Sequence, residues 1–293
     1  MAVSKIIQTL SYSLKETPTK VKPKLKNLSN IRAVVFDIYG TLLISNVGSN
    51  SMADTSVEND EAIKEALIAS DFEILEPEVK LSEQYVEYVR AHYDIRRSEG
   101  ILYPEINISD VWQDYLNELF TQGVIDGDLT ERSIKRVILN HEFRVNPVWP
   151  RKGSLEFLRS LQDSDICSGV VSTAQFYTKL ALETLYQNSL DTLGFKKSIC
   201  IWSFEHWHVK PSDVLFKACV TGLDSLGIEP EETLYVGNDM HNDIIPAYKF
   251  GFNTALFAGD KKSYNITTTE GDINACKPTI IFTEFAQLQN CIP

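Results

Sequence analysis

A short apolar run that stops at a single aspartate constrains the fold of this chain more than any other feature. Ala33–Phe36 reads A-V-V-F, and Asp37 follows it directly. The run is too short for a typical helix, and its valines favour a buried strand. Gly40 permits the sharp turn that should follow such a strand. Asp37 is therefore predicted at the carboxyl end of a parallel strand, where open α/β sheets bind ligands.

Strand-like and helical patterns alternate along the second half of the chain. Strands are predicted at 166–171, 199–202, 233–236, 254–257 and 279–282, and helices at 153–162, 212–226 and 242–250. Strands that alternate with helices indicate a parallel, doubly wound sheet. The predicted fold class is therefore α/β.

A long helical insertion separates the first predicted strand from the others. Residues 44–56 are small and polar, which is typical of a linker, and four helical patterns follow at 58–70, 78–98, from 109 onward and at 129–142. No convincing strand is predicted between them. We therefore predict an all-α cap at 44–146, inserted into an α/β core formed by 31–43 and 147–293.

The first thirty residues form a third segment, a basic N-terminal extension. Residues 1–30 contain six lysines and only one acidic residue, Glu16, whereas the whole chain has a net charge of −12. We interpret the segment as a solvated extension that lies on the acidic body. The alternative is an adaptor tail for an anionic surface.

Composition excludes several classes of function. The net charge of −12 argues against nonspecific binding of nucleic acid. No apolar stretch approaches the length of a membrane span, and the N-terminus lacks the apolar core of a secretory signal. The five cysteines are widely spaced, as expected for reduced thiols. We therefore expect a cytoplasmic protein, and the sequence leaves its oligomeric state open.

Polar side chains follow several of the predicted strands. Because the carboxyl ends of parallel strands lie at one edge of a sheet, these side chains can converge. Each has an ordinary structural explanation when taken alone, such as a helix N-cap, a surface lysine or an acid in the first turn of a helix. The candidates are Asp37, Ser172, Thr173, Lys210, Asn238, Asp239 and Asp243.

Four stretches together resemble the ordered motifs of the haloacid dehalogenase-like (HAD) hydrolase superfamily. They are F-D-I-Y-G-T-L-L (36–43), V-V-S-T (170–173), V-K-P-S-D-V-L-F (209–216) and Y-V-G-N-D-M-H-N-D-I (235–244). The resemblance extends from about residue 31 to the end, and the insertion matches the position of that family's helical cap. Most members are Mg²⁺-dependent phosphate hydrolases that form an aspartyl-phosphate.

The resemblance implies a role for each candidate residue. Asp37 is the expected nucleophile, and Lys210 is expected to offset the charge of Asp37 and of the phosphoryl group. Thr41, Ser172 and Thr173 are expected to contact the phosphoryl oxygens. The expected Mg²⁺ ligands are Asp37, the backbone carbonyl of Tyr39 and Asp239, with Asn238 and Asp243 in the same group.

Two residues depart from the pattern of the family's phosphatases. Tyr39 stands where they usually carry an aspartate that acts as general acid and base, and a phenol is a poor base at neutral pH. Asn238 stands where many members carry the first aspartate of the last motif. Tyr39 is shared with the family's 2-haloacid dehalogenases, which need no metal.

The acidic residues near Asp37 favour one of three possible functions. Asp239 and Asp243 add negative charge beside Asp37, which is reasonable mainly when a cation is present. Arg90 comes later than the cap arginine of the dehalogenases. Arg90 and Arg97 share one helix face, which we interpret as solvated, and the alternative is that they grip an anionic substrate. We therefore predict a Mg²⁺-dependent phosphatase that acts on a small phosphorylated metabolite. The alternatives are a metal-independent 2-haloacid dehalogenase and a binding or regulatory module with low turnover.

Overall fold

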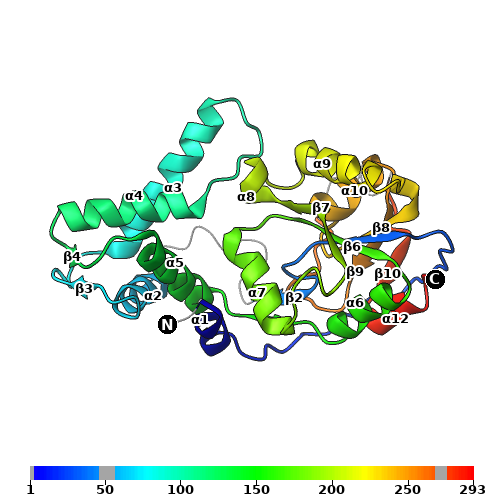
Figure 1. Cartoon of the computed structure of the whole chain (residues 1–293), viewed down its shortest axis with the longest axis horizontal. Helices are drawn as coiled ribbons and strands as arrows, with labels where there is room; N and C mark the ends of the chain where they lie inside the picture. The colour runs from blue at the N-terminus through cyan, green and yellow to red at the C-terminus, as the bar shows by residue number, and fades with distance from the viewer. Residues whose placement is uncertain (1–2, 46–56, 268–275) are drawn as a thin grey trace.

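The computed structural model describes residues 3–45, 57–267 and 276–293, and Figure 1 shows an α/β core beside a helical cap. The core strands are β1 (Ala33–Phe36), β6 (Cys167–Ser172), β7 (Phe195–Trp202), β8 (Thr233–Gly237), β9 (Asn253–Phe257) and β10 (Ile280–Phe282). The core helices and helical turns are α6 (Ser154–Asp163), α7 (Phe176–Tyr186), α8 (Ser203–His206), α9 (Asp213–Asp224), η1 (Pro230–Glu232), η2 (Met240–Ile244), α10 (Ile245–Lys249) and α12 (Phe285–Gln289). The predicted alternation of strands and helices is confirmed, although the sequence analysis missed α7.

The six core strands form one parallel sheet in the order β10-β9-β8-β1-β6-β7. The first strand of the chain therefore lies in the middle of the sheet. Phe36 pairs with Val170 of β6 on one side and with Val236 of β8 on the other. This register brings the residues that follow β1, β6 and β8 to one edge of the sheet. The predicted doubly wound α/β core is confirmed.

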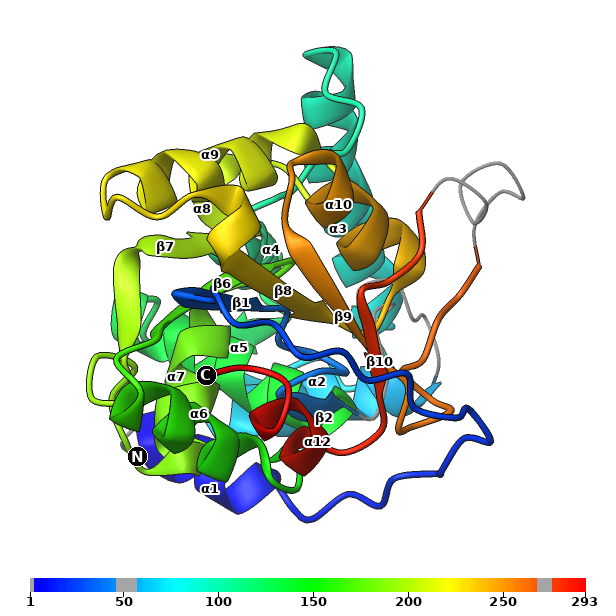
Figure 2. The ribbon, with the colours of Figure 1, turned by 90° about the vertical axis from the view of Figure 1, so that its right-hand side faces the viewer.

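Helices cover both faces of the sheet, as Figure 2 shows. Side chains of a strand point alternately to opposite faces, and β1 follows this rule. Val34 and Phe36 belong to the larger hydrophobic core, which includes residues of α6 and α12. Val35 packs instead in a second core with Phe216 of α9. Because all four residues of β1 are buried, the strand is apolar throughout.

The cap contains the four predicted helices, but it also contains strands that were not predicted. Its helices are α2 (Val57–Ile68), α3 (Leu81–Ser98), α4 (Ile108–Thr121) and α5 (Glu131–Val145). Two residue pairs form a small antiparallel ladder of β3 (Glu73–Ile74) and β4 (Ile125–Asp126). These strands are too short to give a periodic pattern in the sequence. The predicted linker at 44–56 lies mostly outside the described residues.

The junctions between core and cap are held together by backbone pairing. β2 (Leu43–Ser45) leads out of the core and β5 (Val148–Pro150) leads back into it. The two strands pair antiparallel, with Ile44 opposite Trp149. The two segments that connect the core to the cap, β2 and β5, therefore lie side by side, next to the turn that follows Asp37.

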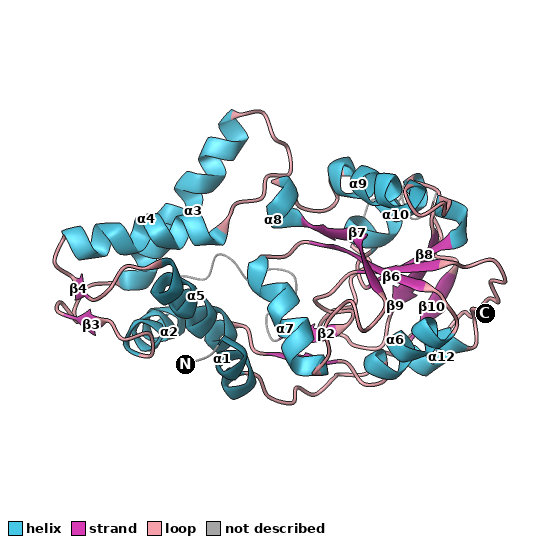
Figure 3. Ribbon diagram, in the orientation of Figure 1, coloured by secondary structure: helices cyan, strands magenta, loops and turns pink. Residues whose placement is uncertain are grey.

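The N-terminal segment begins with a packed helix and continues as a largely exposed stretch that lies on the core. α1 (Val3–Leu10) lies against α5 of the cap and α7 of the core, and Ile6 and Ile7 are buried in the larger hydrophobic core (Figure 1). Further along, the backbone of Lys24 exchanges two hydrogen bonds with Ile281 at the sheet edge. Only α1 departs from the expected solvated extension, because its apolar residues lie together on one side of a short helix. Figure 3 shows α1 next to α5, at the lower edge of the view.

Two expectations from composition can be compared with the described structure. Cys167, Cys200, Cys219 and Cys291 have free thiols, as predicted. Within 3–45, 57–267 and 276–293, no helix combines the length and apolar character needed to cross a bilayer.

Candidate active site

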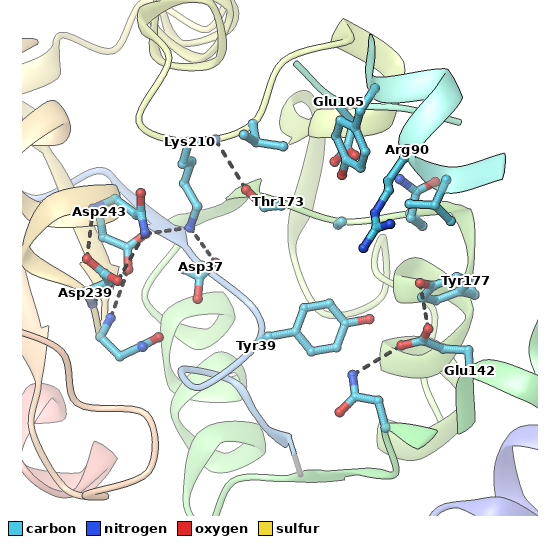
Figure 4. A pocket seen from close by; sticks show the side chains of 18 of the residues that line it. Asp37, Tyr39, Arg90, Glu105, Glu142, Thr173, Tyr177, Lys210, Asp239 and Asp243 are labelled. Atoms are coloured by element: carbon cyan, nitrogen blue, oxygen red, sulfur yellow. Dashed lines mark hydrogen bonds and ion pairs between the residues drawn. The ribbon is translucent and has the colours of Figure 1, made fainter. Parts of the chain in front are cut away.

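Asp37 lies at the carboxyl end of β1, on the floor of a cavity between core and cap (Figure 4). Lys210 Nζ lies 2.6 Å from Asp37 Oδ1, and the Ser172 hydroxyl donates to the same oxygen over 3.1 Å. Thr41 donates to Oδ2 over 3.2 Å. Each carboxylate oxygen can accept about two hydrogen bonds. Oδ1 is therefore fully engaged, whereas Oδ2 has room for another partner.

Lys210 is clamped between two carboxylates. Its Nζ lies 2.6 Å from Asp37 and 2.5 Å from Asp243 Oδ1, and 8% of its surface is exposed. Burial lowers the pKa of Lys210, but the charges of Asp243 and Asp37 outweigh burial and raise its pKa above the ordinary value. Lys210 therefore stays protonated and provides a fixed positive charge beside Asp37.

Asp243 holds the loop that follows β8. Its Oδ2 accepts the backbone N–H groups of Asn238 (3.1 Å) and Asp239 (3.0 Å). Its Oδ1 accepts Lys210 and the Tyr235 hydroxyl, which lies 3.2 Å away. All four acceptor positions are thus occupied by the protein. Asp243 is placed to orient Lys210 and the loop.

Asp239 acts as the N-cap of η2. Its Oδ1 accepts the backbone N–H groups of His241 (2.8 Å) and Asn242 (2.9 Å), and its Oδ2 accepts the side-chain amides of Asn242 (3.1 Å) and Asn265 (2.7 Å). These four bonds also fill the carboxylate. The ordinary structural explanation, an acid at a helix start, therefore describes Asp239. Its predicted role as a metal ligand stays a prediction, and it would require these bonds to be exchanged.

Asn238 shares a hydrogen-bond partner, Thr41, with Asp37. The Thr41 hydroxyl lies 2.9 Å from Asn238 Oδ1 and 3.2 Å from Asp37 Oδ2. The amide is fixed in this orientation because its Nδ2 donates to the Ser263 carbonyl over 2.7 Å. The oxygens of Asn238 and Asp37 therefore face the same hydroxyl group, whose single proton they share.

Tyr39 and Thr173 also line the cavity. The Tyr39 hydroxyl lies 2.9 Å from Thr178 Oγ1. Burial, followed by the charge of Glu142, raises the pKa of Tyr39 above that of a free phenol. Tyr39 therefore remains protonated and cannot serve as a base near neutral pH. Thr173 accepts the backbone N–H of Lys210 over 3.3 Å and so helps to position that loop.

We use two names for opposite sides of this cavity, which has a volume of about 630 Å³. The floor consists of Asp37, Lys210, Asn238, Asp239 and Asp243, which follow core strands. The far wall consists of Arg90, Glu105, Glu142 and Tyr177, and Figure 4 shows Tyr39 between it and the floor. The sequence-predicted residues are thus brought together on the floor.

The far wall contains groups that the sequence analysis missed or interpreted differently. Arg90 and Arg97 are both exposed, as the interpretation of a solvated face implies, and both also line the cavity. Arg97 pairs with Asp94 at 2.9 Å, whereas no ion pair of Arg90 is found among the described residues. Glu105 and Glu142 were not singled out, since no local motif marks either residue. Only tertiary structure places them opposite Asp37.

Glu105 is a buried carboxyl at the junction of cap and core. The Ser203 hydroxyl of α8 donates to it over 2.5 Å, and the backbone N–H of Ile106 donates over 3.0 Å. Burial raises the pKa of Glu105 to about 7. A carboxyl with this pKa is partly neutral near physiological pH.

Comparison with known proteins identifies the fold family. A family model described as a haloacid dehalogenase-like hydrolase matches residues 31–251, which is most of the chain. The chain belongs to this family. No curated protein matches it.

Solved structures of HAD-family proteins cover most of this chain at low identity. A HAD phosphatase from Thermococcus onnurineus is 16% identical, with 88% of this chain and 96% of that chain covered and a TM-score of 0.47. An L-2-haloacid dehalogenase from Xanthobacter autotrophicus is 18% identical, with coverage of 88% and 97% and a TM-score of 0.44. A dehalogenase with an intermediate complex is 17% identical, with coverage of 89% and 96% and a TM-score of 0.48. At these values they do not indicate a substrate.

The HAD family implies a metal ion for its phosphatases, and the floor residues fit one in part. Among the described residues, no group of three or more histidine, cysteine, aspartate or glutamate side chains is arranged to hold a metal. Mg²⁺ needs only one or two carboxylates, however, and takes water for its other ligands. Asp37 Oδ2 has an open acceptor position, and Asn238 Oδ1 faces the same hydroxyl. The hydrogen bonds of the floor therefore leave Asp37 and Asn238 available to a metal ion, and the predicted pair of Asp37 and Asp239 stays a prediction.

Proposed function

We propose that this HAD-like hydrolase cleaves small phosphomonoesters through a covalent phosphate intermediate on Asp37. The observation that supports this most is the position of Asp37 at the end of the central strand, 2.6 Å from Lys210 on the floor of a cavity. A fixed ammonium beside the nucleophile offsets the repulsion between a carboxylate and an anionic phosphoryl group.

The reaction has two steps. An Asp37 oxygen attacks phosphorus, the ester oxygen leaves with the electron pair of its bond to phosphorus, and it takes a proton from water. Water then attacks the phosphorus of the aspartyl phosphate, which releases inorganic phosphate and restores the carboxylate. Division into two steps replaces one difficult displacement by two easier ones. Ser172 and Thr41 donate to Asp37 and orient its carboxylate, and we propose that they also donate to the phosphoryl oxygens.

The charge of the floor supports a role for a divalent cation. The floor holds three acidic side chains, Asp37, Asp239 and Asp243, against one positive charge, Lys210, and burial raises the pKa of Asp243 to about 7. A phosphate dianion would add to this excess of negative charge. Mg²⁺ would be held by Asp37, Asn238 and the backbone carbonyl of Tyr39, and it would supply Lewis-acid stabilisation of the phosphoryl oxygens.

Tyr39 limits which substrates react well. Because the phenol stays protonated, has a raised pKa and is held by Thr178, it is a poor acid and a poor base. Substrates whose leaving group needs no proton are therefore favoured, such as aryl phosphates and acyl phosphates. Simple alkyl phosphates should react more slowly.

The test is hydrolysis of p-nitrophenyl phosphate with and without Mg²⁺. We expect turnover that EDTA reduces and added Mg²⁺ restores. If the wild type hydrolyses no phosphate ester under any of these conditions, the proposal is wrong.

A second candidate is a metal-independent 2-haloacid dehalogenase. Two observations favour it: Tyr39 on the cavity and Arg90, a cavity-lining cation for which no ion pair is found among the described residues. Asp37 would then displace halide from carbon, and water would hydrolyse the resulting ester. Halide release from 2-chloropropionate that is insensitive to EDTA and lost in Arg90→Ala would favour this candidate over the phosphatase.

A further inference from the structure

Glu142 presents a carboxylate to the cavity at a distance from the reacting centre. The Tyr177 hydroxyl donates to Glu142 Oε2 over 2.9 Å, and Asn146 Nδ2 donates to Oε1 over 3.2 Å. Each oxygen therefore keeps one open acceptor position. The residue is half-buried, and its side chain is a lining residue of the cavity. Burial raises the pKa of Glu142, as expected for a carboxylate that has only neutral donors.

No cation of the described residues pairs with Glu142. Lys210 is engaged by Asp37 and Asp243 on the floor, and Arg97 pairs with Asp94. Arg90 lines the same cavity from α3, but it makes no ion pair with Glu142 on α5, and Figure 4 shows the two side chains entering the cavity from different elements. Carboxylates removed from water are normally paired, so a solitary one on a substrate cavity calls for an explanation.

We propose that Glu142 binds a protonated amine of the substrate, so that the preferred substrate is a phosphomonoester with an ammonium group at the end opposite its phosphate. This inference rests on the proposed function, since the phosphate is assigned to the floor. The amine completes the open acceptor positions of Glu142 and supplies an opposite charge, since Arg90 on the same wall makes no ion pair with Glu142. Tyr177 and Asn146 hold the carboxylate in place before the substrate arrives, which lowers the entropic cost of binding.

Glu142 is a better amine ligand than Glu105, the other carboxyl of the far wall. Glu105 is 1% exposed, and donors from Ser203 and Ile106 already connect it to the core. Glu142 keeps accessible surface on the cavity side. A cationic ligand is also favoured over a neutral hydroxyl, because a carboxylate in a partly dry site gains most from an opposite charge.

The experiment compares two series of substrates that differ only in the terminal group. The first contains 2-aminoethyl, 3-aminopropyl and 4-aminobutyl phosphate, and the second contains the corresponding hydroxyalkyl phosphates. We measure kcat and KM for the wild type, Glu142→Gln and Glu87→Gln, a matched control on the exposed face of α3. We expect the wild type to prefer one amine, and Glu142→Gln to raise KM for that amine by about tenfold or more. The hydroxyl series, p-nitrophenyl phosphate and the control variant should change little.

Binding separates failure of this inference from failure of the proposed function. Calorimetric titration of each variant with the same ligands requires no turnover. If no phosphate ester is hydrolysed but the wild type binds an aminoalkyl phosphate more tightly than its hydroxyl partner, and Glu142→Gln loses that preference, the inference stands and the phosphatase proposal fails. If amine and hydroxyl ligands behave alike, or if Glu142→Gln leaves the preference unchanged, the inference is wrong and Glu142 is structural.

Discussion

The two sides of the cavity are built in different ways. On the floor, Asp243 and Asp239 have every carboxylate acceptor position filled by protein donors, and Lys210 is fixed between two acids. On the far wall, Glu142 accepts only two neutral donors, and no ion pair of Arg90 is found within the described part of the chain. The floor is rigid before substrate binds, whereas the far wall has unfilled positions.

This difference corresponds to a division of labour. A reaction centre benefits from groups that are already oriented, because no reorganisation is then needed during the reaction. A recognition surface needs groups that only the correct ligand completes, because an unfilled polar position discriminates against ligands that cannot fill it. The floor is therefore suited to chemistry and the far wall to the choice of substrate.

The largest expected effect comes from removing the nucleophile. Asp37→Asn keeps the size of the side chain but removes its charge, so turnover of p-nitrophenyl phosphate should fall by about a thousandfold or more. Circular dichroism and thermal unfolding of the variant should show that the fold is kept. Equal turnover in wild type and variant would show that Asp37 is not the nucleophile. It would favour the alternative of a binding or regulatory module.

The same comparison explains what could be predicted from sequence. The floor residues follow strands, and strand ends carry local signals, namely an apolar run followed by polar residues, as at Phe36 and Asp37. The resemblance to the HAD family also rested on the order in which these motifs follow one another along the chain. Glu142 lies near the end of an amphipathic helix and has no such signal. Its position opposite Asp37 depends on how the cap packs on the core.

Asp239 and α1 illustrate two further limits. Sequence alone does not decide whether an acid after a strand faces a ligand or caps the next helix, and here four N–H groups engage Asp239. The sequence analysis missed α1, although its apolar residues Val3, Ile6, Ile7 and Leu10 have the spacing of one helix face. Tertiary contacts with α5 and α7 stabilise this helix, and they are not visible in the segment itself.

The next largest effect is on stability, and it concerns α1, which joins the cap to the core. Ile7 of α1 is fully buried where this helix packs against α5, which carries Glu142, and against α7. Ile7→Ala should lower the free energy of unfolding by about 2–5 kcal/mol, since it leaves a cavity. Urea denaturation measures this, with exposed Gln8→Ala as the control. An unchanged free energy in Ile7→Ala would mean that α1 does not stabilise the junction.

Stability should also depend on pH through Glu105. Burial raises the pKa of Glu105 to about 7 in the folded state, so the folded protein binds its proton more tightly than the unfolded chain does. The favourable contribution is full below the unfolded pKa, and it is lost as the pH rises through about 7. Between pH 5 and pH 8 the loss should be about 2 kcal/mol.

Glu105→Gln isolates this contribution because glutamine does not titrate. The variant should be about as stable as the wild type at pH 5, because Glu105 is protonated there and the glutamine carbonyl can still accept the Ile106 N–H, and it should lose less stability on going to pH 8. Denaturation at both pH values measures the difference. An identical pH dependence in the two proteins would show that Glu105 keeps an ordinary pKa.

The smallest effect concerns which floor residue faces the metal. If Asn238 and Asp37 form the site, Asn238→Asp adds a carboxylate beside Asp37 and should tighten Mg²⁺ binding by roughly tenfold, because each carboxylate strengthens the affinity for a hard cation. Asp239→Asn should leave that affinity nearly unchanged. It should instead lower the free energy of unfolding by about 1–2 kcal/mol, because an amide group would face the donors of Asn242 and Asn265.

Calorimetric titration with MgCl₂ and urea denaturation of both variants separate the two arrangements without reference to activity. Loss of Mg²⁺ binding in Asp239→Asn, with no gain in Asn238→Asp, would restore the Asp37–Asp239 pair as the site. In that case the four bonds of Asp239 must be exchanged when the ion binds, and the floor would be less rigid than its hydrogen bonds indicate. Absence of binding in the wild type and in Asn238→Asp would remove the metal from the proposed function and strengthen the dehalogenase candidate. A floor that is complete before the ion binds therefore requires Asp239 to keep its four hydrogen bonds when the ion is present.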